Sequence, residues 1–280
     1  MHKASTGVND IKLLVLDIDG TITGDSNTLS VTVKEVIAAV QAKGIKVAIA
    51  TGRMYCSALR FHQEIGSTLP LIAYQGAWIQ DPGNDQIHRH LPVSREITQQ
   101  LLEYFEQPDL RSLLSVHFYI NDQLYVREIT KETDNYQQRS GVTAISVGDL
   151  RQLLDHEPTK ILALSEDANL TQQLLADLRL KYKPTDLYLT TSVPTFLEAA
   201  NTHVNKGNAV RYLAEEMLGL ENHHVMTIGD NFNDVEMLSY AGISVAMGNA
   251  PPEVQAIANW VAPSIELDGA AIAIEKFLLS

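Results

Sequence analysis

The sequence contains a single cysteine, Cys56, among its 280 residues. One thiol cannot form a disulfide within the chain, which favours a reducing compartment. Basic residues are also scarce, because 21 Lys and Arg stand against 34 Asp and Glu, for a net charge of −13. A protein that binds the phosphate backbone of nucleic acids would carry a basic face, so we expect no nucleic-acid partner.

Long apolar runs are missing as well. No segment approaches the roughly 18 apolar residues of a membrane span, and the first ten residues, MHKASTGVND, lack the apolar core of a signal peptide. We therefore expect a cytoplasmic protein with no membrane partner. Hydrophobic residues make up 45% of the chain and charged residues 20%, which allows a sizeable buried core. The oligomeric state cannot be predicted.

Short apolar runs that end in Gly or Asp alternate with helical patterns at both ends of the chain. Residues 11–17 and 45–51 have the composition of strands buried on both faces. Between them lies a helical pattern, for which Thr32 and Glu35 form a candidate capping box. The last third repeats the alternation. The pattern predicts an α/β fold with a Rossmann-like, doubly wound parallel sheet.

The middle of the chain is more polar and mixed in character. Residues 84–191 contain several strand-like runs, including a hairpin signal at Asn121-Asp122, and one clear helical pattern. We interpret this segment as an α+β domain inserted into the α/β core, which would consist of residues 1–83 and 192–280.

Pairs of acidic residues follow two of the predicted strands. Asp17 and Asp19 come after the first strand, and Asp230 and Asp234 come after a later one. Residues two apart in a strand lie ~7 Å apart on the same side, so we expect Asp17 and Asp19 to converge. Ligands of open α/β sheets bind at this carboxyl edge. Such a cluster needs a cation, and oxygen ligands favour Mg²⁺.

Polar and positively charged residues, which can bind anions, occur at the ends of two other predicted elements. Thr51, Gly52 and Arg53 follow the second strand, and Lys206 stands at the start of a helix, where anions bind. We predict that Arg53 forms a structural ion pair rather than a substrate contact. Acids, a metal, a hydroxyl group and a lysine together favour phosphoryl transfer.

The four segments DIDGT, ATGR, NKG and GDNFND occur in this order at residues 17–21, 50–53, 205–207 and 229–234. They resemble the four motifs of the haloacid dehalogenase-like (HAD) phosphatases. The wide insertion between the second and third segments resembles the C2B-type cap of the Cof-like (IIB) subfamily. The resemblance covers nearly the whole chain, and finding both acidic motifs correctly interleaved with the other two makes it specific.

The resemblance implies a role for each motif residue. Asp17 would be the nucleophile that forms an aspartyl-phosphate, and Asp19 would be the general acid and base. Mg²⁺ would be held by Asp17, the backbone carbonyl of Asp19 and Asp230, with Asp234 orienting the metal shell. The groups expected to bind the phosphoryl oxygens are Ile18, Thr51, Gly52, Lys206 and Asn233.

The sequence thus predicts a phosphatase that acts on small phosphorylated metabolites, namely sugar phosphates or phosphorylated cofactors. A sugar phosphomutase or a dedicated sugar-phosphate phosphatase of the same superfamily is one alternative. A non-catalytic sugar-phosphate sensor is another. One departure from the family pattern is Gln75, where many members have Asn, and this change affects the expected contacts to the leaving group.

Two adjacent histidines, His223 and His224, suggest a metal site. Neighbouring residues of a strand point to opposite faces. We therefore expect the two imidazoles to lie apart and to form no joint site.

Overall fold

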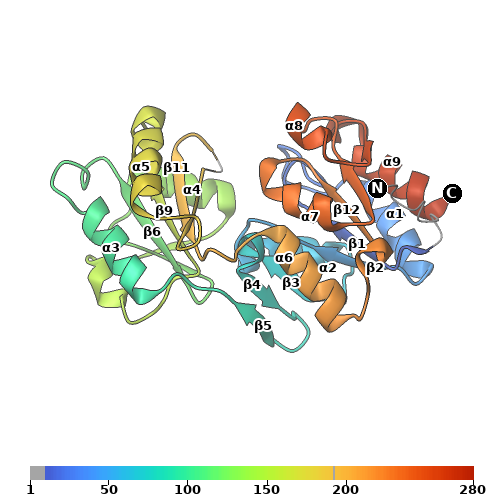
Figure 1. Cartoon of the computed structure of the whole chain (residues 1–280), viewed down its shortest axis with the longest axis horizontal. Coiled ribbons are helices and arrows are strands. Elements are labelled where there is room, and N and C mark those ends of the chain that lie inside the picture. Colours follow the sequence, from blue (N-terminus) through green and yellow to red (C-terminus); the bar gives the residue numbers. More distant parts are fainter. Residues whose placement is uncertain (1–9, 192) are drawn as a thin grey trace. The chain divides into compact units, whose positions relative to one another are not determined.

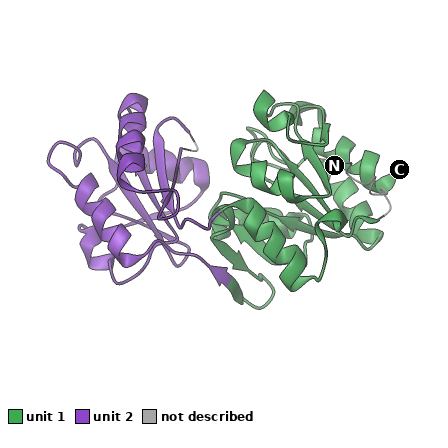
Figure 2. Cartoon of the chain, viewed as in Figure 1, with its two compact units in different colours: residues 1–88, 205–280 green, residues 89–204 purple. Residues whose placement is uncertain are grey.

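The computed structural model describes residues 10–191 and 193–280. The chain divides into two compact units, of which unit 1 contains the residues up to 88 and residues 205–280, and unit 2 contains residues 89–204 (Figure 2). The predicted insertion, 84–191, ends earlier than unit 2. The difference arises because β11 (Phe196–Ala200) pairs with β9 (Lys160–Leu164) in the sheet of unit 2.

Unit 1 is built on a five-stranded parallel sheet with the order β14-β13-β12-β1-β2, of which Figure 1 labels β12, β1 and β2. Leu13 of β1 lies opposite both Lys46 of β2 and Val225 of β12. All four residues of β1 are fully buried, as expected for a central strand covered on both faces. The strands are β1 (Leu13–Leu16), β2 (Lys46–Ile49), β12 (Val225–Gly229), β13 (Ile243–Ala246) and β14 (Trp260–Val261).

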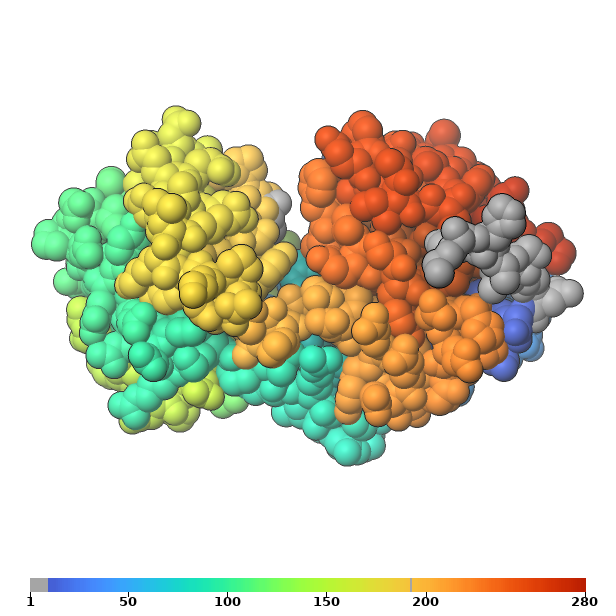
Figure 3. All heavy atoms as spheres, viewed as in Figure 1, coloured from blue at the N-terminus to red at the C-terminus, as the bar shows by residue number. Residues whose placement is uncertain are grey.

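Helices cover this sheet, and residues 205–280, coloured orange to red, form much of the visible face of unit 1 in the space-filling view (Figure 3). The first helix begins two residues earlier than predicted, because Ser30 is its N-cap and accepts a 3.1 Å hydrogen bond from the Val33 amide. The predicted capping box of Thr32 and Glu35 is therefore wrong. The helices are α1 (Val31–Ala42), α2 (Tyr55–Glu64), α6 (Lys206–Arg211), α7 (Val235–Tyr240), α8 (Pro252–Gln255) and α9 (Gly269–Ile274).

A small antiparallel sheet follows α2 in the chain. It consists of β3 (Leu71–Ala73), β4 (Trp78–Gln80) and β5 (Ile87–His90). Ala50, just after β2, forms a parallel bridge to Ile72. This bridge fixes the segment of Thr51 to Arg53 beside the loop that follows β3.

Unit 2 has its own six-stranded sheet with the order β10-β11-β9-β6-β7-β8. The predicted hairpin is confirmed, because Asn121 and Asp122 connect β6 and β7 with φ values of 50° and 58°. Its core is separate from that of unit 1. The other elements are β6 (Ser115–Ile120), β7 (Gln123–Val126), β8 (Ala144–Ser146), β10 (Tyr188–Thr190), α3 (Arg95–Phe105), α4 (Lys131–Ser140) and α5 (Ala168–Lys181).

The predicted fold class, an α/β parallel-sheet core with an inserted α+β domain, is confirmed. Among the residues described, no helix combines the length and the apolar character needed to cross a membrane.

Candidate active site

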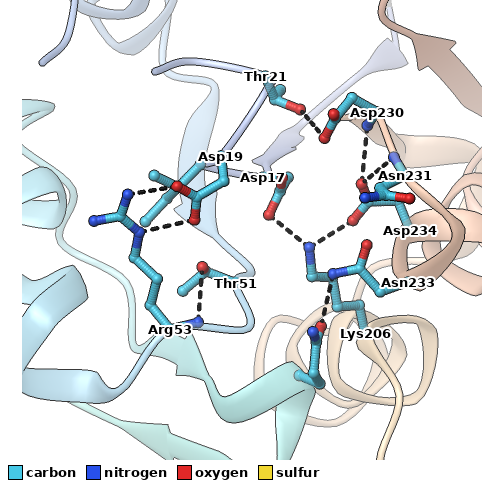
Figure 4. A network of polar contacts seen from close by, with 12 residues as sticks. Asp17, Asp19, Thr21, Thr51, Arg53, Lys206, Asp230, Asn231, Asn233 and Asp234 are labelled. Carbon is cyan, nitrogen blue, oxygen red and sulfur yellow. Dashed lines mark hydrogen bonds and ion pairs between the residues drawn. The ribbon is translucent and has the colours of Figure 1, made fainter. Parts of the chain in front are cut away.

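Lys206 lies at the centre of a buried ion-pair network at the carboxyl edge of the sheet in unit 1 (Figure 4). Its Nζ is 2.5 Å from Oδ1 of Asp17 and 2.6 Å from Oδ1 of Asp234. The side chains of Lys206 and Asp234 are fully buried, and that of Asp17 is 6% exposed. Asp17 directly follows β1, Lys206 begins α6 and Asp234 follows β12, so three distant segments of the chain build this network.

The second carboxylate oxygen of Asp234 also has hydrogen-bond partners. Its Oδ2 accepts hydrogen bonds from the backbone amides of Asp230 at 2.9 Å and Asn231 at 3.1 Å. Gly229 makes room for this arrangement, because a Cβ at that position would overlap the Asp234 carboxylate. Asp234 therefore holds the loop after β12 and the ammonium group of Lys206 in one geometry.

Carboxylate oxygens of Asp17, Asp230 and Asp234 all lie within 4.8 Å of one another. Burial raises the pKa of Asp17 well above its usual value, against the opposing effect of Lys206. Burial and the nearby Asp234 raise the pKa of Asp230 to about 7. Burial alone would lower the pKa of Lys206, but Asp17 and Asp234 raise it above its ordinary value. One ammonium group does not balance three carboxylates, so the cluster suits an additional hard cation.

Two side chains that sequence reasoning missed orient Asp230. Thr21 donates from Oγ1 to Oδ1 of Asp230 at 3.3 Å. Asn249, from the loop after β13, lies 3.4 Å from Oδ2 of Asp230 and donates at 2.9 Å to the Gly20 carbonyl. Thr21 belongs to the DIDGT segment and could have been found there, whereas nothing in the sequence relates Asn249 to that loop.

Asp19 has a different environment from Asp17. Its side chain is 62% exposed and accepts two hydrogen bonds from the Arg53 guanidinium, at 2.8 and 2.5 Å. Arg53 also donates to Oδ1 of Asn27 at 2.7 Å. The prediction that Arg53 forms an ion pair is confirmed, and its partner is Asp19. The two acids have separate partners because β1 ends at Leu16, so the alternation of a strand does not continue through Asp19.

The remaining predicted site residues line the loops around these acids. In the described chain, the backbone amides of Ile18 and Gly52 have no hydrogen-bond partner, which leaves both donors available to an anion. Oγ1 of Thr51 accepts the Arg53 amide at 3.1 Å. Asn233 donates from Nδ2 to Oε1 of Gln75 at 3.1 Å.

Gln75 occupies the position at which the sequence departs from the family pattern. It adopts a left-handed backbone conformation, with φ of 58°. A Cβ on Gly52 would overlap the side-chain amide of Gln75, so the two residues lie close together. Gln75 therefore contacts two of the segments predicted to bind phosphate, those of Gly52 and Asn233.

Comparisons with known proteins agree with this site. The family model described as haloacid dehalogenase-like hydrolase matches residues 14–274. The Bacillus subtilis protein YxeH is 31% identical over 96% of this chain and 99% of its own length. The 5-amino-6-(5-phospho-D-ribitylamino)uracil phosphatase YitU, from the same organism, is 28% identical over 95% of this chain and 97% of its own.

A solved structure described as a HAD subclass IIB sugar phosphatase has the same fold. It matches with a TM-score of 0.80 at 22% identity, and covers 95% of this chain and 98% of that one. The resemblance found in the sequence is thereby confirmed. Since the family model spans both halves of unit 1 and all of unit 2, the chain belongs to the haloacid dehalogenase-like hydrolases.

Proposed function

We propose that this enzyme is a Mg²⁺-dependent phosphatase that hydrolyses small phosphate monoesters through an aspartyl-phosphate on Asp17. The observation that carries the proposal is the buried Lys206, whose ammonium group joins Asp17 to Asp234 beside the third carboxylate, Asp230. A lysine held there opposes the effect of burial on the pKa of Asp17 and presents positive charge where phosphoryl oxygens would lie.

In the first chemical step, an oxygen of Asp17 attacks phosphorus while the bond from phosphorus to the ester oxygen breaks. Asp19 gives a proton to the departing alkoxide, which leaves as the alcohol. In the second step, water attacks phosphorus, Asp19 takes the proton of that water, and the carboxylate of Asp17 is released with inorganic phosphate. The amides of Ile18 and Gly52, with Thr51, Lys206 and Asn233, would hold the phosphoryl oxygens.

The residues present fit Mg²⁺. Asp17, Asp230 and the backbone carbonyl of Asp19 would be its protein ligands, and Asp234 would orient the shell through Lys206 and the backbone of the loop after β12. When bound, the ion would neutralise charge that develops on the phosphoryl group. The raised pKa of Asp230, to about 7, supports a cationic ligand, because a nearby divalent ion stabilises the ionised carboxylate.

Sugar phosphates or phosphorylated cofactor precursors are the substrate classes we propose. One relative is named for a phosphorylated ribityl-pyrimidine, and one solved structure of the same fold is described as a sugar phosphatase. Unit 2, as the inserted domain, would supply specificity, with Gln75 contacting the leaving group. A cytoplasmic enzyme without a nucleic-acid partner stays our prediction.

The proposal is tested with p-nitrophenyl phosphate, with and without Mg²⁺. We expect phosphate release that needs Mg²⁺ and is abolished in Asp17→Asn, whereas Asp25→Asn, the same change in an exposed loop acid, keeps full activity. A native protein that releases no phosphate with Mg²⁺ would favour the sensor. Migration of phosphate on a hexose monophosphate, without its release, would favour the mutase.

A further inference from the structure

The two adjacent histidines lie together, contrary to the prediction from sequence. His223 and His224 belong to a 3₁₀ turn, Asn222–His224, that precedes β12. Their ring centroids are 3.9 Å apart. The prediction was wrong because it assumed the alternation of a strand, whereas successive residues of a 3₁₀ turn are rotated by about 120°. Both rings therefore lie on the amino-terminal side of the sheet, opposite the carboxylate cluster.

Asp10, which stands just before β1, completes a group of three metal-binding side chains. Its Oδ2 is 3.8 Å from Nε2 of His223 and 3.4 Å from Nε2 of His224. Ligands of a tetrahedral ion with bonds of ~2.1 Å lie about 3.4 Å from one another. Both distances are thus near the spacing that an ion such as Zn²⁺ requires, and ligand atoms of all three residues lie within 4.8 Å of one another.

A neighbouring carboxylate lies on the side of His223 where it would favour the tautomer that such a site needs. Oε2 of Glu221 is 3.4 Å from Nδ1 of His223. A proton on Nδ1 that points to Glu221 leaves Nε2 with a free lone pair towards Asp10. Histidines that ligate metals commonly have a second partner of this kind.

Lys12 at present supplies the positive charge of this cluster. Its Nζ is 3.3 Å from Nε2 of His224 and 4.0 Å from Oδ1 of Asp10. The lysine side chain is 54% exposed, so it can move into solvent when another cation arrives. Its position marks the place at which a cation is stabilised.

We propose that Asp10, His223 and His224 form a second metal site, which binds Zn²⁺ or a similar transition-metal ion and is independent of catalysis. Two imidazoles favour such ions over Mg²⁺, which prefers oxygen. The ion would join the segment before β1 to the turn before β12, two strands that pair directly. A bound ion would therefore stabilise the centre of the unit 1 sheet.

The test is a titration of the full-length protein with Co²⁺, a spectroscopic substitute for Zn²⁺, in excess Mg²⁺ to occupy the carboxylate cluster. We expect one equivalent of Co²⁺ with the visible absorption of a low-symmetry nitrogen and oxygen site, and competition by Zn²⁺. His223→Ala and Asp10→Asn should each weaken binding at least about tenfold. Lys12→Met should strengthen it, because the competing ammonium group is removed.

The matched control is His156→Ala, which removes an exposed histidine from unit 2 and should change nothing. All variants should keep Mg²⁺-dependent activity and their metal-free melting temperature, which verifies folding and separates this proposal from the proposed function. Native protein that binds no Co²⁺, or binding that survives in both His223→Ala and Asp10→Asn, overturns the proposal.

Discussion

Arg53 holds the carboxylate of Asp19 through two hydrogen bonds, and this contact constrains how Asp19 transfers protons. We therefore regard Arg53 as a positioning residue that holds Asp19 until the substrate arrives. Cζ of Arg53 also lies 4.8 Å from the centroid of the Phe61 ring, and this cation–π contact restricts the Arg53 side chain in turn.

If Arg53 acts through Asp19, the effects on kcat of replacing the two residues are not additive. Asp19→Asn should lower kcat by about 10²–10⁴ on an alkyl phosphate, and Arg53→Met by a smaller factor. The double variant should be no slower than Asp19→Asn alone. Steady-state kcat and KM of the four proteins measure this, and losses that multiply would show that Arg53 has a separate role.

Gly20 provides a second test at the scale of one residue. Its φ is +79°, and an added Cβ would overlap the Asp230 carboxylate. Gly44, with φ of +84°, has no atoms within 4 Å of such a Cβ. Both Gly→Ala changes should lower the free energy of unfolding by about 1–2 kcal/mol, but only Gly20→Ala should also lower Mg²⁺-dependent activity. Equal activity in the two variants would contradict the close packing of Gly20 against Asp230.

At the scale of elements, two variants at the start of α1 distinguish the observed N-cap, Ser30, from the predicted one, Thr32. Ser30→Ala removes the acceptor for the Val33 amide and should cost about 1 kcal/mol of stability. Thr32→Ala alters an exposed residue inside the helix and should cost little. Urea unfolding of both variants checks this, and the reverse order of stabilities would restore the capping box.

His117 of β6 makes unit 2 sensitive to acid. The side chain is fully buried, 2.9 Å from Oγ1 of Thr133, and burial together with Lys160 lowers its pKa from 6.5 to about 3. The unfolded chain takes up a proton below pH 6.5 and the folded protein does not, so stability is present above that pH and is lost as the pH falls towards 3.

Replacing His117 should make the pH dependence shallower. His117→Gln removes the titrating group, and we expect the native protein to lose up to about 1.4 kcal/mol per pH unit more than this variant in that window. Denaturant unfolding at a series of pH values gives both slopes, with the exposed His156→Gln as control. Parallel slopes for native protein and His117→Gln would show that His117 is not responsible.

Over the whole molecule, patterns with a local cause were predictable from sequence and long-range partners were not. The buried strands at 11–17 and 45–51 and the turn at Asn121-Asp122 follow from periodicity and turn chemistry. The end of unit 2 could not be predicted in this way, because the pairing of β11 with β9 depends on contacts distant in the sequence.

The same limit applies to the site. The motif order indicated that acids follow two strands and that a lysine begins a helix, and the parallel sheet places Asp17, Lys206 and Asp234 together. The partner of Arg53 and the contribution of Asn249 became visible only in three dimensions. The histidine pair was mispredicted because its turn was taken for a strand.

The central claim, that Asp17 becomes phosphorylated with the help of Lys206 and a metal ion, is tested most directly by rapid acid quench. Enzyme mixed with a ³²P-labelled sugar phosphate and Mg²⁺ should carry label that hydroxylamine removes, and peptide mapping should locate it at Asp17. Label should be absent from Asp17→Asn and without Mg²⁺, and present after Asp25→Asn. Phosphate release by native enzyme with no labelled Asp17 under these conditions would contradict the account.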